Sequence, residues 1–351
     1  MIFGCFNYRI SEGSHFTTPK KSQVAASGPG MSSLSVGQFQ KSVHQPNKYK
    51  KEKFEDPTTD SPTPTNMTNF PVQLGGIDLE PGAIMVNKRS DGITTIAINR
   101  PKKRNAIDIP TAKKLHAAFL DFESDVTQKV SVLYGNGGTF SAGFDLTQLE
   151  NWCQPAPNTV EHPSITRRYF EQVRGENIGP LGPTRMNIRK PVICAISGYA
   201  VAGGLELSLL GDIRIVDEDA IFEISCRKIG VPLLDGGTVR LPQIVGLGRA
   251  LDLILTGRPV TGKEALGIGL ASRVVPKGQS LEEAMKLART LIGFPQDCLN
   301  VDRQSCYYAA YYAQSLEDAL SQEFKAGTRV SDLAIEAGLA FIRKSRRRSK
   351  L

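Results

Sequence analysis

Glu206 is the residue of this sequence best placed for chemistry. It is the only charged residue between Lys190 and Asp212, and a lone carboxylate at the start of an apolar helix is costly unless it has a partner or a task. The small residues 202–204 (Ala-Gly-Gly) just before it leave backbone N–H groups open at a helix N-terminus, which favours negative charge on a ligand oxygen. The sequence therefore predicts an oxyanion donor, the N–H of Gly203, beside a carboxylate that can exchange a proton.

A second turn could supply the other oxyanion donor. The apolar run 130–133 is followed by a glycine-rich segment and then by Gly143 and Phe144. We expect the N–H of Phe144 to point at the same oxygen as the N–H of Gly203. Two such donors would hold a thioester carbonyl and stabilise an enolate, and removing one typically costs about 10²–10³ in rate.

These residues stand in blocks that resemble the crotonase (enoyl-CoA hydratase/isomerase) superfamily. The matching blocks, in family order over about residues 82–345, are Arg100-Pro101 with Arg104-Asn105-Ala106, Phe140-Ser141-Ala142-Gly143-Phe144-Asp145-Leu146, Lys190-Pro191 with Gly198-Tyr199-Ala200-Val201-Ala202-Gly203-Gly204-Leu205-Glu206-Leu207, Asp212, Gly230-Val231-Pro232 with Gly236-Gly237 and Arg240-Leu241, and Leu255-Thr256-Gly257-Arg258 with Ala265 and Gly269-Leu270. The resemblance implies an α/β fold, a crotonase-like spiral of ββα turns with a helical C-terminal trimerisation region. It also implies an acyl-CoA or enoyl-CoA substrate, no metal or redox cofactor, and a homotrimer or a dimer of trimers.

The resemblance also places the coenzyme A site. In the family, backbone carbonyls of an Arg-Asn-Ala loop and a Ser-Ala-Gly loop hold the adenine. The residues that match these loops here are Arg104, Asn105, Ala106, Ser141, Ala142 and Gly143. Phe341 and Lys344 resemble, more weakly, the family's late contacts with coenzyme A.

The second acid is where the sequence departs from the family pattern. Hydratases of this family use two glutamates, the second twenty residues after the first, and counting from Glu206 that position is Cys226. A neutral thiol with an ordinary pKa of about 8.5 is a poor general acid near pH 7. Asp235 could be the second acid, facing the pocket from a neighbouring turn, or it could cap the helix that begins beside it. Glu206 and Asp235 are the candidate catalytic residues.

The preferred function is enoyl-CoA hydratase-type chemistry, a lyase reaction, in fatty-acid β-oxidation. Double-bond isomerisation of an enoyl-CoA is the alternative, because it needs one base to move a proton. Hydrolase and decarboxylase activities stay open. From a different class, the chain could be a non-catalytic acyl-CoA-binding homologue, since the second glutamate is missing.

Hydrophobic patterning predicts the elements that must position these residues. Residues 83–87 and 93–99 flank an Asp-Gly turn and predict a hairpin. Strands at 130–134 and 192–196 alternate with helices, the first at 110–122, which indicates βαβ units. Further helices are predicted at 247–256, 262–267, 280–293, 298–314, 317–328 and 332–345. The long polar segment 147–189 should cover the acyl pocket and set substrate choice.

We divide the chain into four parts: a leader, a spiral core, a helical C-terminal region and a basic tail, at 1–78, 79–270, 271–345 and 346–351. The leader is rich in Ser, Thr, Pro and Lys, and we predict that it is disordered. The net charge of +8 lies mostly in the leader and the tail, so the core is nearly neutral, which argues against nucleic acid as a partner.

Cysteine and histidine usage excludes several site types. The six cysteines show no paired spacing and predict reduced intracellular thiols. All four histidines precede residue 163, so neither a histidine zinc site nor a Ser-His-Asp triad fits. No apolar run approaches the roughly 18 residues of a membrane span.

The last three residues, Ser349, Lys350 and Leu351, match a peroxisomal address read by an import receptor. The sequence therefore predicts a peroxisomal location. A mitochondrial location is the alternative, because the basic, hydroxylated N-terminal residues could form a transit peptide.

Overall fold

The computed structural model describes residues 80–149 and 172–348. The predicted leader, the Ser-Lys-Leu end and residues 150–171 of the polar segment lie outside the described residues. The strands are β1 (Ile84–Lys88), β2 (Ile93–Ile98), β3 (Val130–Gly135), β4 (Val192–Ile196), β5 (Tyr199–Val201), β6 (Ile213–Asp217), β7 (Ile221–Glu223), β8 (Pro259–Thr261) and β9 (Arg273–Val275). The helices are α1 (Ile109–Ser124), α4 (Gly203–Ser208), α5 (Cys226–Ile229), α6 (Gly237–Val245), α7 (Leu247–Thr256), α8 (Gly262–Gly267), α9 (Ser280–Ile292), α10 (Gln296–Tyr311), α11 (Leu316–Thr328) and α12 (Ser331–Arg348), with 3-10 turns η1 (Pro101–Lys103) and η2 (Pro183–Arg185).

The strands of the core form two sheets. The larger sheet has the order β1-β2-β3-β4-β6-β9 and is parallel except for β1, while the smaller sheet has the order β5-β7-β8. The consecutive strands β4 and β5 lie in different sheets, and so do β6 and β7, and each pair is followed by a short helix, α4 or α5. This is the predicted α/β spiral of ββα turns.

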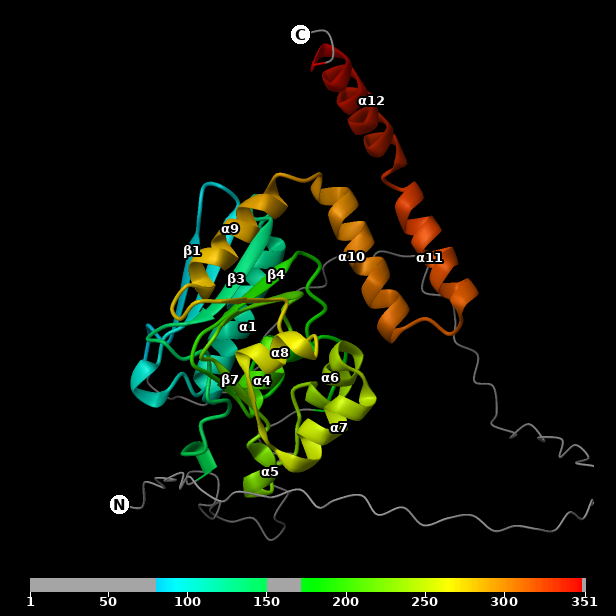
Figure 1. Cartoon of the computed structure of the whole chain (residues 1–351). Coiled ribbons are helices and arrows are strands. Elements are labelled where there is room, and N and C mark those ends of the chain that lie inside the picture. The colour runs from blue at the N-terminus through cyan, green and yellow to red at the C-terminus, as the bar shows by residue number, and fades with distance from the viewer. Residues whose placement is uncertain (1–79, 150–171, 349–351) are drawn as a thin grey trace, which may run out of the picture. The chain divides into compact units, whose positions relative to one another are not determined.

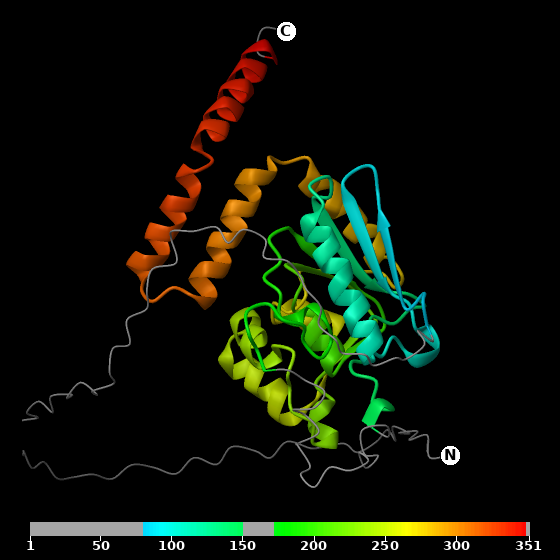
Figure 2. The same cartoon turned by 180° about the vertical axis from the view of Figure 1, so that it is seen from behind.

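Both faces of the larger sheet are covered, as a parallel sheet requires. Val192, Cys194 and Ile196 of β4 belong to the hydrophobic cluster that contains the buried side chains of α1. Ile193 and Ala195 point the other way, into a cluster with the buried side chains of α9. Figure 1 shows α9 in front of the sheet, and Figure 2 shows α1 on the opposite face.

Helix α10 is fastened to the core through one carboxylate. Asp212, at the start of β6, accepts hydrogen bonds at Oδ1 from Arg303 Nε (2.9 Å) and from the Tyr307 hydroxyl (2.7 Å). Its other oxygen accepts the N–H of Val192 (2.8 Å). Arg303 Nη1 also donates to the carbonyl of Ile188 (2.6 Å). The charged pair therefore fixes one side of α10 against the segment that leads into β4.

The hairpin, the first helix, both central strands and the six later helices are confirmed. The largest difference in the bounds is at α10, predicted at 298–314 and observed at Gln296–Tyr311. The Ser315 side chain accepts the N–H of Asp318 and caps the N-terminus of α11. This cap lies between the end of α10 and the start of α11. None of the described helices is long and apolar enough to cross a membrane.

Candidate active site

The two predicted oxyanion turns meet in the structure. Gly143 has a φ of +87°, and a Cβ at this residue would lie 2.7 Å from the backbone nitrogen of Gly203. Only glycine therefore leaves the Gly203 N–H open to a ligand. The turn that carries Phe144 is tied to the loop before α1, because Ile107 N donates to Gly143 O (2.7 Å) and Asp145 N to Ile107 O (2.9 Å). Both predicted donors thus lie at the same place in the fold.

A strained residue precedes the Gly203 donor. Ala202 has φ +52° and ψ −127°, a conformation that costs a residue with a Cβ roughly 1–3 kcal/mol. Its N–H donates to the carbonyl of Glu223 at the end of β7 (2.8 Å), which holds the peptide in place. The strain aims the next peptide, and hence the Gly203 N–H, before any substrate arrives. Glycine-rich composition alone did not indicate that an alanine would carry this conformation.

Glu206 is buried with one carboxylate oxygen fixed. Its side chain is 2% exposed, and Oε1 accepts the backbone N–H groups of Asp235 (3.0 Å) and Gly237 (2.9 Å). None of the described residues bonds to Oε2. Burial, with a further contribution from the Asp235 charge, raises the pKa of Glu206 to about 7, while the two N–H bonds act in the opposite direction. A carboxyl with this pKa can both accept and donate a proton near neutral pH.

An apolar cavity of about 190 Å³ lies between the oxyanion turns and Glu206. Its described lining is Ala142, Phe144, Leu146, Leu149, Pro180, Ala202, Gly203, Glu206, Ser225, Cys226, Ile229, Val231, Pro232, Leu234 and Asp235. The described wall is mostly apolar, and two carboxyl groups, one hydroxyl and one thiol interrupt it. Such a site excludes water from an acyl chain while keeping one proton-exchanging group beside it.

Asp235 lines the same cavity but does not cap helix α6. The residue at the N-cap of α6 is Gly236, with no side-chain cap, so the capping interpretation is wrong. Oδ1 of Asp235 instead accepts the N–H of Leu181 (3.0 Å) and the hydroxyl of Thr184 (2.5 Å). These partners come from a remote loop, and Leu181 in turn packs against Gly203. The backbone N–H groups at the start of α6 donate to Glu206 instead.

Burial acts on the pKa of Asp235 in the same direction as on that of Glu206. The residue is 5% exposed, and burial raises its pKa, against the effect of its hydrogen bond to Thr184. Its backbone N–H holds Glu206, so Asp235 joins the loop at 181–184 to the candidate base. Sequence reasoning missed Thr184 altogether. The only signal was that it lies in the long segment expected to shape the pocket.

Cys226 occupies the cavity wall as the first residue of α5. It is buried, and burial raises the pKa of the thiol to about 11, with a smaller effect from Glu206. The thiol is therefore neutral at pH 7 and does not replace a second glutamate as an acid.

The two predicted coenzyme A loops lie side by side. Ala142 N donates to Arg104 O (3.0 Å), and the Ser141 hydroxyl donates to Asn105 O (2.8 Å). The Asn105 side chain is fully buried and binds Arg100 N, Asn136 O and Thr139 O, so it shapes the loop from inside. Each carbonyl oxygen keeps a second lone pair for a ligand.

A buried guanidinium supports both loops. The Arg100 side chain is 1% exposed and pairs with Glu80, Asp108 and Asp145 at 2.5, 2.7 and 3.2 Å. It also donates to the carbonyl of Ala106 (2.5 Å). A buried charge with several partners is costly to disturb, because removing it takes the ion pair from Asp108 and leaves Glu80 and Asp145 with their ion pairs to Lys103.

The structure does not bring the late coenzyme A residues to the site. Phe341 lies on α12 with its ring 71% exposed, and it is not among the described residues that line the cavity. Lys344 lies on the same helix, and its side chain is outside the described part of the chain. Their contact with coenzyme A stays a prediction.

Residues 88–332 match the model of a protein family described as enoyl-CoA hydratase/isomerase. A carnitinyl-CoA dehydratase from Salmonella arizonae is 36% identical over 206 residues, which cover 58% of this chain and 72% of that protein. A solved structure of an enoyl-CoA hydratase from Mycobacterium marinum is 29% identical with a TM-score of 0.64, and covers 75% of this chain and 96% of its own. A hydratase from Geobacillus kaustophilus is 26% identical with a TM-score of 0.64, over 75% of this chain and 95% of its own.

The comparisons overturn the predicted peroxisomal location and its mitochondrial alternative. The relatives come from Salmonella and Mycobacterium, bacteria that have neither organelle, and this contradicts both predicted locations. A terminal Ser-Lys-Leu acts only where an import receptor reads it. The same three residues also lie outside the described part of the chain.

Proposed function

The chain belongs to the enoyl-CoA hydratase/isomerase family, and on this premise we propose that it adds water reversibly to the double bond of a 2-enoyl-CoA. It is a crotonase-type acyl-CoA enzyme, and its relatives named as hydratases and as a dehydratase agree with lyase activity. The observation that supports this reaction best is the position of Glu206. Its carboxyl group, with a pKa raised to about 7, lines an apolar cavity together with Gly203 and Phe144.

In the proposed mechanism, Glu206 carries the proton in both half-steps. The N–H groups of Phe144 and Gly203 hold the thioester oxygen. Water forms a C–O bond at the β-carbon while its O–H bond breaks and the proton passes to Glu206. The π electrons move onto the thioester oxygen as an enolate. The enolate then collapses and takes the proton from Glu206 at the α-carbon, which restores the carboxylate.

The fixed oxygen of Glu206 determines which oxygen reacts. Because Oε1 accepts two backbone N–H groups, proton exchange falls to Oε2. In this proposal Asp235 acts through Glu206, since its backbone N–H fixes Oε1 of Glu206 while its Oδ1 accepts bonds from Leu181 and Thr184. No cofactor beyond the coenzyme A thioester is needed. The proposed cellular role is fatty-acid β-oxidation.

Double-bond isomerisation is the second candidate. It needs one group that removes a proton and returns it two carbons away, and Glu206 beside a neutral Cys226 offers one such group. The purified chain should be assayed with 2-trans-enoyl-CoA and 3-enoyl-CoA of equal length, together with carnitinyl-CoA, the substrate that its relative's name indicates. Hydration that exceeds isomerisation supports the proposal, the reverse supports isomerase, and inactivity on all three supports an acyl-CoA-binding protein.

We also propose that copies of the chain assemble as a trimer or a dimer of trimers. Exposed apolar side chains recur at helical spacing on one face of α11, at Leu316, Leu320 and Phe324. Analytical ultracentrifugation of the full chain measures this directly, and a monomer at micromolar concentration contradicts it.

A further inference from the structure

A second and larger cavity, of about 560 Å³, lies on the far side of the turn that holds Glu206. We call it the arginine cleft. Its described lining is Val173, Thr184, Arg185, Met186, Asn187, Ile188, Leu210, Leu233, Leu234, Gly236, Thr238, Val239, Arg240, Arg303, Tyr307, Tyr311 and Tyr312. The volume lies within the range of about 300–1,000 Å³ typical of small-molecule sites. Among the residues that line the cleft, only Thr184 enters the mechanism proposed above, through its bond to Asp235.

The cleft carries positive charge without an acid in its described wall. Its lining includes three arginines and neither aspartate nor glutamate. Asp212 neutralises Arg303, as described for α10. Arg240 forms a salt bridge with none of the described carboxylates, although its charge acts to lower the pKa of Glu206 and of Asp235 against the effect of burial. Its Nη1 donates one long bond (3.3 Å) to the carbonyl of Asp235. Most of the five N–H donors of Arg240 are therefore available to a ligand.

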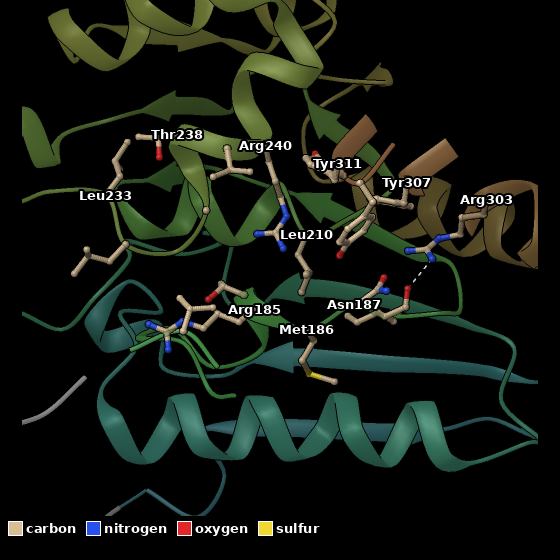
Figure 3. A pocket seen from close by; sticks show the side chains of 17 residues that line it. Arg185, Met186, Asn187, Leu210, Leu233, Thr238, Arg240, Arg303, Tyr307 and Tyr311 are labelled. Carbon is tan, nitrogen blue, oxygen red and sulfur yellow. Dashed lines mark hydrogen bonds between the residues drawn. The ribbon is translucent and has the colours of Figure 1, made fainter. Parts of the chain in front are cut away.

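The turn before α6 is shaped to hold the Arg240 guanidinium. A Cβ on Gly236, whose φ is +90°, would lie 2.5 Å from Arg240 Nη1, so a side chain at this residue would displace the flexible end of Arg240. Figure 3 shows Arg240 reaching into the middle of the cleft, with Tyr307 and Tyr311 on one side and Arg185 on the other. The guanidinium is thus placed where a ligand would bind.

The rest of the wall suits an apolar body. The lining includes the apolar residues Met186, Leu210 and Leu233, and Figure 3 shows Leu210 beside Arg240. The rings of Tyr307 and Tyr311 stack with centroids 6.0 Å apart. Burial raises the pKa of Tyr311, against the effect of the Arg240 charge, so its hydroxyl stays a neutral donor. One guanidinium fork beside a mainly apolar wall matches a carboxylate on a hydrocarbon chain.

We propose that the arginine cleft binds an organic carboxylate with an apolar body, anchored by Arg240. This ligand can come from two sources. It can be the far end of an acyl thioester held in the catalytic cavity, since Leu234 lines both cavities, and this version rests on the proposed function. It can also be a free carboxylate that binds on its own. The chemistry of recognition is the same.

The free source is tested by calorimetric titration of the full chain with adipate, with 1,6-hexanediol as an uncharged ligand of equal length. If a free carboxylate binds, adipate should bind at least ten times more tightly than the diol. Arg240→Leu should weaken adipate binding at least tenfold. The matched control is Arg249→Gln, which removes the same charge from an exposed site on α7 outside the cleft and should change adipate binding less than twofold.

The acyl source is tested by kinetics. We compare kcat/KM for a 2-enoyl-CoA that ends in a carboxylate with that for the methyl-ended thioester of equal length. If the cleft receives the acyl end, the wild type should prefer the charged substrate about tenfold or more, and Arg240→Leu should reduce this ratio to near one. Because both rates are measured on the same variant, any change in Glu206 cancels from the ratio. Arg240→Gln replaces Arg240→Leu if the latter does not fold.

A tenfold effect in either experiment supports the cleft and identifies the source. If adipate binds no better than the diol and the wild type shows no preference for the charged substrate, the proposal is wrong. The proposal is also wrong if the Arg240 variants retain both the tighter binding of adipate and the preference for the charged substrate. The titration requires no turnover. An enzyme that hydrates 2-enoyl-CoA but fails both tests therefore overturns the cleft and leaves the proposed function standing.

Discussion

The catalytic cavity and the arginine cleft lie on opposite sides of one turn and have opposite charge. In the catalytic cavity, the backbone N–H groups of Asp235 and Gly237 point at the Glu206 carboxylate. In the cleft, the carbonyl of Asp235 points at the Arg240 guanidinium. A peptide backbone carries donors and acceptors in opposite directions, so a single turn can hold a carboxylate on one side and a guanidinium cation on the other.

The two cavities also differ in the chemistry of their charged side chains, Glu206 and Arg240. Burial raises the pKa of Glu206 to about 7, which makes it an acid–base group. A guanidinium carries several N–H donors and no acceptor, so the Arg240 side chain is suited to bind a carboxylate. We therefore assign chemistry to the first cavity and recognition to the second.

Glu206→Gln gives the sharpest test of that division. The amide keeps the shape of the side chain and an acceptor for the two N–H groups, but it cannot take a proton. We expect turnover of the preferred enoyl-CoA to fall by at least about 10²-fold. Adipate titrated into the same variant should still reach the cleft. Turnover close to that of the wild type would remove Glu206 from the mechanism.

The pH dependence of the free energy of unfolding, compared between the wild type and Glu206→Gln, tests the raised pKa of Glu206. The folded-state pKa of Glu206, about 7, exceeds its ordinary value of 4.5, so its contribution to stability is fully present below about pH 4.5 and is lost as the pH rises through 7. Between pH 5 and 8 the wild type should lose on the order of 2 kcal/mol relative to Glu206→Gln. Urea unfolding at both pH values measures it, and parallel curves would contradict the raised pKa.

Asp235 lies between the two cavities. Substitutions at Asp235 and Thr184 distinguish a chemical role of the Asp235 carboxyl group from a positioning role. We expect Asp235→Asn to reduce turnover about tenfold and stability by about 1 kcal/mol, because its bonds to Leu181 and Thr184 are weakened. Thr184→Val removes one of these bonds without touching a carboxyl group, and it should reproduce part of both losses. If Asp235 is the second acid, Asp235→Asn will abolish turnover at unchanged melting temperature, and Thr184→Val will be nearly silent.

Cys226 should matter least. Its thiol is neutral, so Cys226→Ala should leave turnover within about threefold and cost about 1 kcal/mol for the lost buried atoms. Cys306→Ala, at an exposed position, controls for cysteine loss in general. A collapse of activity in Cys226→Ala alone would mean that this wall of the cavity does chemistry after all.

The sequence predicted well whatever depends on neighbours along the chain. Alternation and turn residues identify β1 and β2, and periodic apolar residues identify α1 and the later helices. The meeting of Gly203 and Phe144 was also predicted, although it joins segments that are remote along the chain: Gly203 follows β5, and the turn before Phe144 pairs with β5 through the bridge between Ser141 and Ala200. The family resemblance joined these local signals into one fold.

The sequence did not predict several other contacts between residues that are remote along the chain. Asp235 stands before two glycines and a helix, which is the local pattern of a cap, yet its bonds run to Leu181 and Thr184, more than fifty residues away. The acceptor at the start of α6 is Glu206, which no local pattern around α6 indicates. The arginine cleft is built from η2, α6 and α10, and its charge emerges only when these elements pack together.

The shared turn also bears on how such an enzyme can diverge. An inserted or deleted residue at 235–237 would shift the amides that hold Glu206 and the carbonyl that holds Arg240 at the same time. Leu233 and Leu234 line the cavities with their side chains and leave those backbone bonds intact when they are replaced. New substrate ranges should therefore be reached by exchanging these two side chains, while the length of the turn stays fixed in lineages that keep the reaction.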